Sequence, residues 1–358
     1  PSRQRDCDVS RLDDVLRLVR IDSVSGNEHD LAALIFADLV DVPHLVVERI
    51  GDNVIARTEG FHARRILIAG HIDTVPGDVT AARKDDDRVT GLGACDMKGS
   101  LAVMLALAAD PSPRLCEVTW VFYAREEIAR SESGLLEIAQ LRPDLLQADA
   151  AIVAEPTGGA VEAGCQGTLR LGLTVHGQRA HTARPFTGRN AIHRLGAIID
   201  RLASYQPREA SIDGISYTEQ LQVVAVEGGI APNVVPDRAS VVINHRVAPD
   251  RTHEDAVAGV HQLIADLLDP EERLTVLDWA PAAPPSLHHP VIAELVASTG
   301  QPARAKVGWT DVATLSEMGI PATNFGAGDP LLAHRADEFV TEEELDGFSV
   351  AVRGLLFS

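Results

Sequence analysis

Short hydrophobic runs alternate with helix-like patterns along the first part of the chain, and this alternation restricts the fold to a few architectures. Apolar residues recur at helical spacing over residues 12–19 and 31–39, and an apolar helix-like segment covers residues 100–109. The strand-like runs are residues 45–48, 54–57, 66–69, 118–123 and 151–154. Such an alternation predicts an α/β fold with three layers, in which helices cover both faces of a sheet.

The pattern changes near residue 169, where apolar and polar residues begin to alternate strictly through residue 176, as in a half-buried strand. The elements expected after it are a helix at 192–202, strands at 221–226 and 240–247, a helix at 257–267 and a strand at 274–277. This βαββαβ order is typical of a ferredoxin-like domain, and the proline-rich residues 281–285 suit an exit linker. We therefore predict a first domain made of residues 1–172 and 284–358, interrupted by an inserted domain at residues 173–283.

The net charge, the first residues and the cysteines indicate which partners and which cellular location to expect. The formal charge of −20, from 52 acidic and 32 basic residues, repels phosphate backbones and anionic lipid surfaces, so we expect neither nucleic acid nor membrane as a partner. Residues 1–14 lack the apolar segment of a secretory signal, which makes a cytoplasmic location the expectation. The scattered Cys7, Cys95, Cys116 and Cys165 form no CxxC pair and are expected to be reduced thiols.

Metal-ligand residue types follow three of the predicted strands, directly where each strand ends. His71 and Asp73 follow residues 66–69, the pair Glu126-Glu127 follows 118–123, and Glu155 follows 151–154. In open α/β sheets ligands bind beyond the carboxyl ends of the strands, and imidazole and carboxylate groups are zinc ligands. The sequence therefore predicts a metal site at this edge of the sheet.

A fourth carboxylate, Asp96, lies in the glycine-rich loop 91–99 before the apolar helix. Two zinc ions about 3.5 to 4 Å apart can share one carboxylate and one water, and we assign Asp96 as the bridging ligand. His71 and Glu155 would complete the shell of one ion, and Glu127 and His334 that of the other. The expected cofactor is two Zn²⁺, with Co²⁺ or Mn²⁺ as an option at one site, because such ligands tolerate several ions.

Glu126 remains free of this ligand set and is our candidate for the general base that activates the water. Each motif alone has an ordinary structural interpretation, such as a loop, a solvated acidic pair, a helix N-cap, a strand end or a surface histidine. Their joint occurrence in order favours the metal site. The glycines of the loop do not match the GxGxxG spacing of a dinucleotide site, and Cys95 has no histidine partner that would make it a nucleophile.

Five segments resemble the motifs of the M20 metallopeptidase family in their order along the chain, namely GHIDTVP, GLGACDMKG, REE, AEPT and LLAHRADE. The resemblance implies a three-layer α/β/α zinc-hydrolase catalytic domain with an inserted ferredoxin-like domain that serves as lid and dimerisation domain. It also implies that Asp73 orients His71, that the peptide bond after Asp96 is cis, and that the chain forms a homodimer. His181 of one subunit would then polarise the scissile carbonyl in the other.

Within this family, four segments favour members that hydrolyse N-succinyl-LL-2,6-diaminopimelate to succinate and LL-2,6-diaminopimelate, a small-molecule reaction of lysine and cell-wall precursor biosynthesis. These segments are residues 308–311, 228–236, 244–246 and 324–330. The resemblance makes Arg246 a partner for a substrate carboxylate and Asn233 and Thr310 donors to the substrate. Gln166 and Arg184 depart from the better-known pattern, which has Arg and Tyr at these places, and Arg184 would restore the lost charge.

Other functions stay open from the sequence. The nearest are other amide hydrolases of the family, such as an N-acetylornithine deacetylase, an aminoacylase or a dipeptidase. A metal-binding scaffold without activity is a further alternative, against which the presence of the unligated Glu126 argues.

Overall fold

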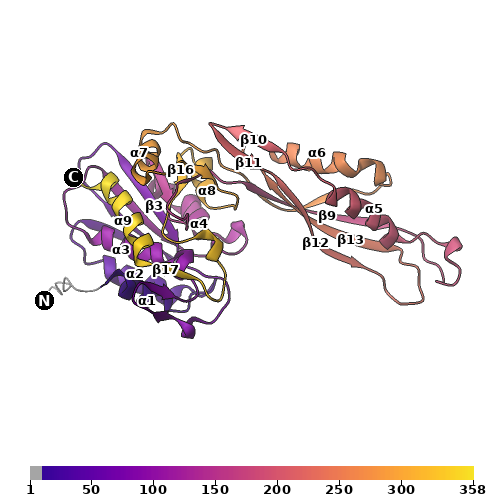
Figure 1. The fold of residues 1–358 in the computed structure, drawn as a ribbon, viewed down its shortest axis with the longest axis horizontal. Coiled ribbons are helices and arrows are strands. Elements are labelled where there is room, and N and C mark those ends of the chain that lie inside the picture. The colour runs from indigo at the N-terminus through magenta and orange to yellow at the C-terminus, as the bar shows by residue number, and fades with distance from the viewer. Residues whose placement is uncertain (1–9) are drawn as a thin grey trace. The chain divides into compact units, whose positions relative to one another are not determined.

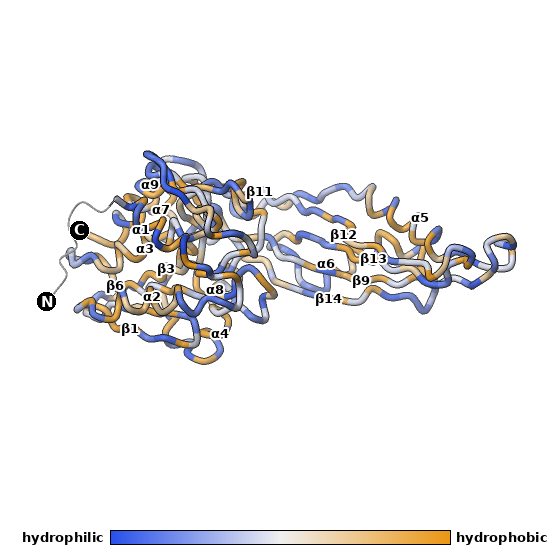
Figure 2. Tube along the Cα trace, turned by 90° about the horizontal axis from the view of Figure 1, so that it is seen from below, coloured by the Kyte–Doolittle hydropathy of each residue, from blue (hydrophilic) through white to orange (hydrophobic). Residues whose placement is uncertain are grey.

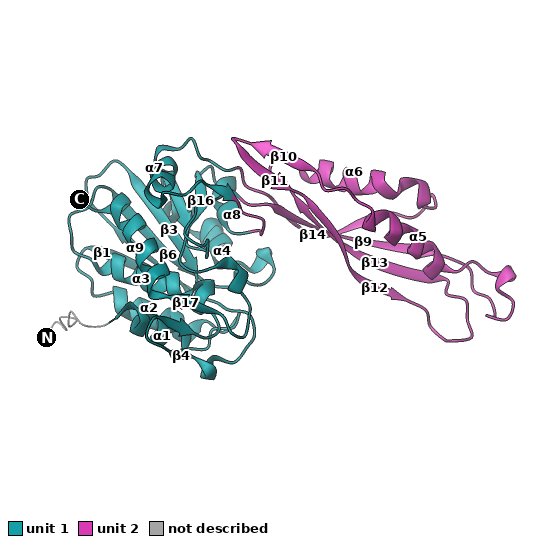
Figure 3. Ribbon diagram, in the orientation of Figure 1, with its two compact units in different colours: residues 1–164, 285–304, 310–358 teal, residues 165–284, 305–309 magenta. Residues whose placement is uncertain are grey.

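The computed structural model describes residues 10–358, so Cys7 and most of the segment tested for a secretory signal lie outside the described residues. The chain forms two compact units, shown in Figure 3: unit 1 comprises residues 1–164, 285–304 and 310–358, and unit 2 comprises 165–284 and 305–309. The predicted boundary at 172/173 differs because it falls inside strand β9 (Gly167–His176). That strand pairs along its whole length with β13 (Arg238–Val247), so it belongs entirely to unit 2.

Unit 1 is built on an eight-stranded mixed sheet with the order β1-β2-β6-β3-β7-β16-β8-β15. Its strands are β1 (Leu45–Ile50), β2 (Asn53–Thr58), β3 (Arg65–His71), β6 (Glu117–Tyr123), β7 (Ala150–Val153), β8 (Glu162–Ala163), β15 (Arg304–Ala305) and β16 (Ala322–Asn324). The neighbours β6, β3, β7 and β16 run parallel. Their carboxyl ends consequently meet at one edge, where the sequence places the candidate ligands.

Helices cover both faces of this sheet (Figure 1). They are α1 (Arg11–Val19), α2 (His29–Leu39), α3 (Gly99–Ala109), α4 (Gly134–Leu141), α7 (Pro290–Thr299), α8 (Val312–Glu317) and α9 (Glu342–Leu356). Residues of α1, α2, α3, α7 and α9 share one hydrophobic core with one face of the central strands, and α4 and α8 contribute none to that core. Instead α4 packs on β2, and α8 packs on β7 and β16. The predicted three-layer arrangement is confirmed.

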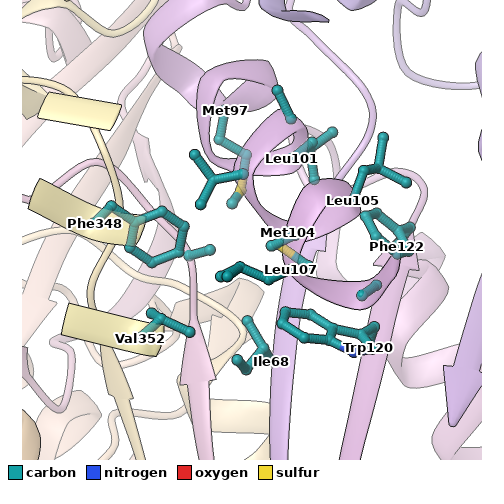
Figure 4. Close-up of a cluster of buried hydrophobic side chains, with 14 of the residues drawn as sticks. Ile68, Met97, Leu101, Met104, Leu105, Leu107, Trp120, Phe122, Phe348 and Val352 are labelled. Carbon is teal, nitrogen blue, oxygen red and sulfur yellow. The ribbon is translucent and has the colours of Figure 1, made fainter. Parts of the chain in front are cut away.

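The helix α3 is the centre of the larger core (Figure 4). It is hydrophobic around its whole circumference, and Ile68 and Trp120 of the sheet and Phe348 and Val352 of α9 enclose it. A helix that is apolar all round is stable only when buried, and in Figure 2 the trace of α3 and β6 is coloured as hydrophobic. Even so, no helix within residues 10–358 has both the length and the apolar character needed to cross a membrane.

A second, three-stranded sheet joins distant parts of unit 1 next to the candidate site, and the sequence analysis did not predict it. It consists of β4 (Arg83–Lys84), β5 (Arg88–Thr90) and β17 (Phe339–Thr341), in the order β17-β5-β4. The pairing of β17 with β5 is antiparallel. It brings the segment that follows His334 against the segment that leads to Asp96.

Unit 2 has a four-stranded antiparallel sheet in the order β12-β13-β9-β14, with β12 (Gln220–Gly228) and β14 (Leu274–Ala280) at its edges. The helices α5 (Ala191–Ala203) and α6 (His253–Ile264) share its hydrophobic core. The order of these elements along the chain is the predicted βαββαβ. A hairpin of β10 (Glu209–Ile212) and β11 (Ile215–Thr218) is an addition that the sequence analysis did not predict.

Candidate active site

Three parallel strands deliver the candidate ligands to one edge of the sheet of unit 1. His71 is the last residue of β3, Glu127 follows the end of β6, and Glu155 follows the end of β7. The Nε2 atom of the buried His71 lies 3.8 Å from Oε1 of Glu155. The shared strand direction therefore gathers these side chains, as the sequence predicts.

Asp96 lies between two histidines that come from opposite parts of the sequence. Its Oδ1 is 3.0 Å from Nε2 of His71, and its Oδ2 is 3.5 Å from Nε2 of His334. The same His334 nitrogen is 2.8 Å from Oε1 of Glu127. Each oxygen of one carboxylate thus faces a different imidazole, which is the arrangement of a carboxylate that bridges two cations.

The donor atoms fit divalent cations in type and spacing. One ligand atom from each of His71, Asp96 and Glu127 lies within 4.8 Å of the other two. In the protein alone, a hydrogen bond with Glu127 raises the pKa of His334 to about 9. A divalent cation binds neutral imidazole and ionised carboxylate, so it would take the place of the shared protons that now hold these groups together.

The carboxylate of Asp73 contacts both the histidine and the acidic pair. The His71 Nδ1 lies 3.0 Å from the carbonyl oxygen of Asp73 and 3.5 Å from its Oδ1. The two carboxylate oxygens also accept hydrogen bonds of 3.0 Å from the backbone N–H groups of Glu126 and Glu127. Burial would raise the pKa of Asp73, but these partners outweigh it and lower the pKa to about 2. The contacts to the two backbone N–H groups were not predicted from the sequence.

The side chain of Glu126 is placed differently from that of its neighbour Glu127. Within residues 10–358 no hydrogen bond reaches its carboxylate. Burial, followed by the nearby charge of Glu155, raises the pKa of Glu126 well above its usual range. A carboxyl group with a raised pKa and no partner is suited to exchange a proton with a bound molecule.

Two further buried charges support the loop that carries Asp96, and the sequence analysis assigned neither of them. Oε1 of Glu338 accepts hydrogen bonds from the N–H groups of Cys95 at 3.1 Å and Asp96 at 3.5 Å, and burial raises the pKa of Glu338 to about 7. The buried Nζ of Lys98 donates to the carbonyl of Ile21 at 2.7 Å. Both residues lie inside the recognised motifs, but contacts to backbone atoms leave no spacing pattern. The peptide bond after Asp96 is cis.

The candidate substrate residues of unit 2 lie at two different ends of its sheet. The loops of His181 and Asn233 pair with each other, with Thr182 N–H donating to the Asn233 carbonyl at 3.1 Å, and both side chains are exposed. Arg184 is exposed in the same loop. Arg246, near the other end of the sheet, is partly buried and donates to the hydroxyl of Thr168.

The remaining two positions are buried within their own units. In unit 1, Thr310 donates its hydroxyl to Oδ1 of Asn324 at 2.8 Å. In unit 2, Gln166 donates to the carbonyl of Thr218 at 3.0 Å. Both side chains thus have partners inside the protein.

Comparisons with known proteins identify the family and the fold of the chain. The model of Peptidase family M20/M25/M40 matches residues 67–356. A Corynebacterium glutamicum protein named succinyl-diaminopimelate desuccinylase is 42% identical over 349 residues, 95% of this chain and 94% of that protein. A Mycobacterium tuberculosis protein that carries the same name provisionally is 47% identical over 326 residues, 90% of this chain and 91% of that protein. The crystal structure of aminopeptidase PepT from Bacillus cereus superposes with a TM-score of 0.79 at 19% identity and covers 96% of both chains, which shows a shared fold.

Proposed function

The chain belongs to peptidase family M20/M25/M40, and from this membership we propose that it removes the succinyl group from N-succinyl-LL-2,6-diaminopimelate as a metal-dependent amide hydrolase. The two relatives that carry the name of this activity align over nearly their whole length. The products would be succinate and LL-2,6-diaminopimelate, a precursor of lysine and of the cell wall.

The observation that carries the proposal is the position of Asp96 between His71 and His334. We assign His71, Asp96 and Glu155 to one zinc ion, and Asp96, Glu127 and His334 to a second, with Co²⁺ or Mn²⁺ as an option at one site. Two such ions supply Lewis acidity for the amide carbonyl and lower the pKa of the attacking water.

The protein's own part in the proposed reaction is proton transfer and orientation. Glu126 takes a proton from the water as its oxygen bonds to the acyl carbon, and later delivers that proton to the departing nitrogen as the C–N bond breaks. Asp73 holds the imidazole of His71 through its Nδ1 side. The neutral amine and the carboxylic acid that result account for both hydrogens of the water.

Arg246 is the best placed candidate for a substrate carboxylate. Burial lowers the pKa of its guanidinium, and its only side-chain hydrogen bond within the described part of the chain is to the hydroxyl of Thr168. A partly buried cation without a carboxylate partner favours an anionic ligand, and a guanidinium can bind a carboxylate with two parallel hydrogen bonds. We propose Asn233, Thr310 and Arg184 as further contacts, with Thr310 acting through a change of its present hydrogen bond.

We propose that His181 serves the active site of a partner subunit in a homodimer. Strand β9 has 10 residues, so about 30 Å separates the two ends of the sheet at a rise of about 3.3 Å per residue. The chain enters β9 at the boundary with unit 1, whereas His181 follows the opposite end of the strand. The edge strand β12, with exposed Val224 and Val226, offers a surface for pairing two copies.

A cytoplasmic location is also part of the proposal. Among the described residues, Cys95 and Cys116 are buried free thiols, which suits a reducing compartment.

Kinetics on metal-stripped and zinc-reconstituted protein test the proposed function. The substrates are N-succinyl-LL-2,6-diaminopimelate, N-acetylornithine, an N-acetyl amino acid and a dipeptide. We expect zinc to restore turnover, and kcat/KM for the succinylated substrate to exceed the others by at least about 100-fold, because buried charged groups discriminate strongly. A higher kcat/KM for another substrate would assign a different amide hydrolase activity, and zinc binding without any turnover would favour a scaffold.

A further inference from the structure

We propose that Glu28 is a positioning residue that holds the turn presenting Glu126 and Glu127. This inference deepens the proposed function and depends on it for the roles of those two residues. Glu28 lies 97 residues before Arg125 in the sequence, and no sequence pattern indicates that it contacts the site. Its carboxylate is nevertheless fully buried and directed at the residue that precedes the acidic pair.

The geometry of the turn shows why it needs an acceptor. Arg125 has a φ of 61°, which is the left-handed region that a residue with a Cβ rarely adopts. Its backbone N–H donates to Oε1 of Glu28 at 3.1 Å. The next two N–H groups, of Glu126 and Glu127, donate to the carboxylate of Asp73. Two carboxylates thus accept three successive N–H groups and keep this turn in an unfavourable conformation.

The two acceptors are tied to one short segment near the N-terminus of α2. Oε1 of Glu28 also accepts the N–H of Gly26 at 2.9 Å, and the hydroxyl of Ser25 donates to Oδ2 of Asp73 at 2.7 Å. Glu28 itself is the N-cap of α2, whose Leu31 and Ile35 are buried in the core. Because α2 is fixed in the core, Glu28 at its N-terminus holds the turn of residues 125–127 in a defined position.

A purely local role does not explain the burial of this carboxylate. Its second oxygen, Oε2, is buried and has no hydrogen-bond partner among the described residues, which is a cost for a charged group. Oε1 accepts two N–H groups, and one of them, that of Gly26, belongs to the same turn as Glu28. Within residues 10–358, the only hydrogen bond that this carboxylate makes with a distant segment is the one to the Arg125 N–H.

The variants Glu28→Ala and Glu28→Gln test this inference, with Glu117→Ala as a matched control. Glu117 is buried at the start of β6, the strand that leads into the turn, and its carboxylate accepts the N–H of His62 at 3.3 Å and the hydroxyl of Thr58 at 2.6 Å. Glu117 is thus, like Glu28, a buried carboxylate that accepts a backbone N–H, but it lies at the opposite end of β6 from Arg125.

Zinc affinity is measured by calorimetry on folded, metal-stripped protein, and kcat and KM are measured at saturating zinc. We expect Glu28→Ala to weaken binding of one zinc ion by roughly 10-fold or more and to lower kcat by roughly 10- to 100-fold with KM nearly unchanged, as for other residues that orient a ligand. Glu28→Gln keeps an oxygen acceptor and should recover both values to within about 3-fold, and Glu117→Ala should leave both values near those of the parent.

A zinc isotherm of Glu28→Ala equal to that of the parent protein would overturn the inference, as would a glutamine variant that is as impaired as the alanine variant. If Glu28→Ala does not fold, Glu28→Met, which fills a similar volume without a hydrogen-bond acceptor, takes its place with the same expected losses and the same contradicting result. The zinc isotherm needs no substrate, so a failure of the proposed succinyl specificity would leave this test unaffected.

Discussion

The Nε2 atom of His334 lies 2.8 Å from Oε1 of Glu127, a residue 207 positions earlier in the chain. The backbone of His334 has a φ of 65°, and the pairing of β17 with β5 anchors the segment after it. A residue with a left-handed backbone at a site of this kind indicates that the surrounding structure holds it there. The C-terminal part of unit 1 thus supplies His334, which completes the second of the two proposed zinc sites.

Removing the proposed general base should abolish turnover but leave the metal in place. Because the carboxylate of Glu126 makes no hydrogen bond within residues 10–358, Glu126→Gln should bind zinc as the parent protein does and lower kcat by roughly 10³-fold. Zinc content by elemental analysis and kcat on the succinylated substrate are the two measurements. A variant that holds zinc and turns over near the parental rate would show that another group is the base.

Arg246 should act on substrate binding more than on the chemical step. Arg246→Met removes the proposed bidentate partner of a substrate carboxylate, so we expect KM to rise by roughly 100-fold with a smaller change in kcat. Arg170→Met is the control, because Arg170 is an exposed cation of the same sheet that pairs with Asp278 instead. Equal effects of the two substitutions would remove Arg246 from the site.

Two inactive variants should complement each other if His181 acts across a dimer. Glu126→Gln and His181→Ala homodimers should each be nearly inactive, whereas co-expression should restore about a quarter of the parental activity, since half of the dimers carry one intact site. The measurement is specific activity of the purified mixture against each variant alone. Absence of any recovery, with hybrid dimers present, would place His181 in its own subunit's site or outside the reaction.

The stability of unit 2 should depend on pH through Glu272. Burial would raise the pKa of this carboxyl, but hydrogen bonds from Arg194 and from the backbone N–H groups of Asp269 and His176 lower it to about 2, from 4.5. A folded-state pKa below the unfolded value stabilises the protein above pH 4.5, and that contribution is lost as the pH falls towards 2.

The measurement is urea unfolding of the parent protein and of Glu272→Gln as a function of pH. At pH 7 the variant should be less stable by on the order of 2 kcal/mol, and the difference should shrink between pH 4.5 and 2. Glu271→Gln alters the exposed neighbouring carboxylate and should change little. A difference between parent and Glu272→Gln that stays constant down to pH 2 would contradict the assigned pKa.

The part of the site that depends on strand direction could be predicted from the sequence. Parallel strands end at one edge, so His71, Glu127 and Glu155 could be grouped from their positions after hydrophobic runs. The partnership with Asp96 and His334 has no such rule, because it depends on a loop and on the pairing of β17 with β5. Asp96 and His334 were assigned as ligands from their residue types, and the resemblance of ordered motifs supports that assignment.

Positions that act through backbone contacts escaped the sequence analysis. Glu28 and Glu338 accept N–H groups of residues near the ligands, and any segment has such N–H groups, so no periodicity or spacing marks the acceptor. The predicted start of the inserted domain at residue 173 differs from the start of unit 2 at Cys165. The prediction divided the strand whose period-two pattern begins at Leu169, whereas the whole of β9, from Gly167, lies in unit 2.

Anomalous X-ray scattering at the zinc edge from crystals of the zinc-reconstituted protein tests the two-zinc assignment. We expect two peaks about 3.5 to 4 Å apart on either side of the Asp96 carboxylate, one next to His71 and Glu155 and the other next to Glu127 and His334. A single peak, or a second peak remote from His334, would contradict it.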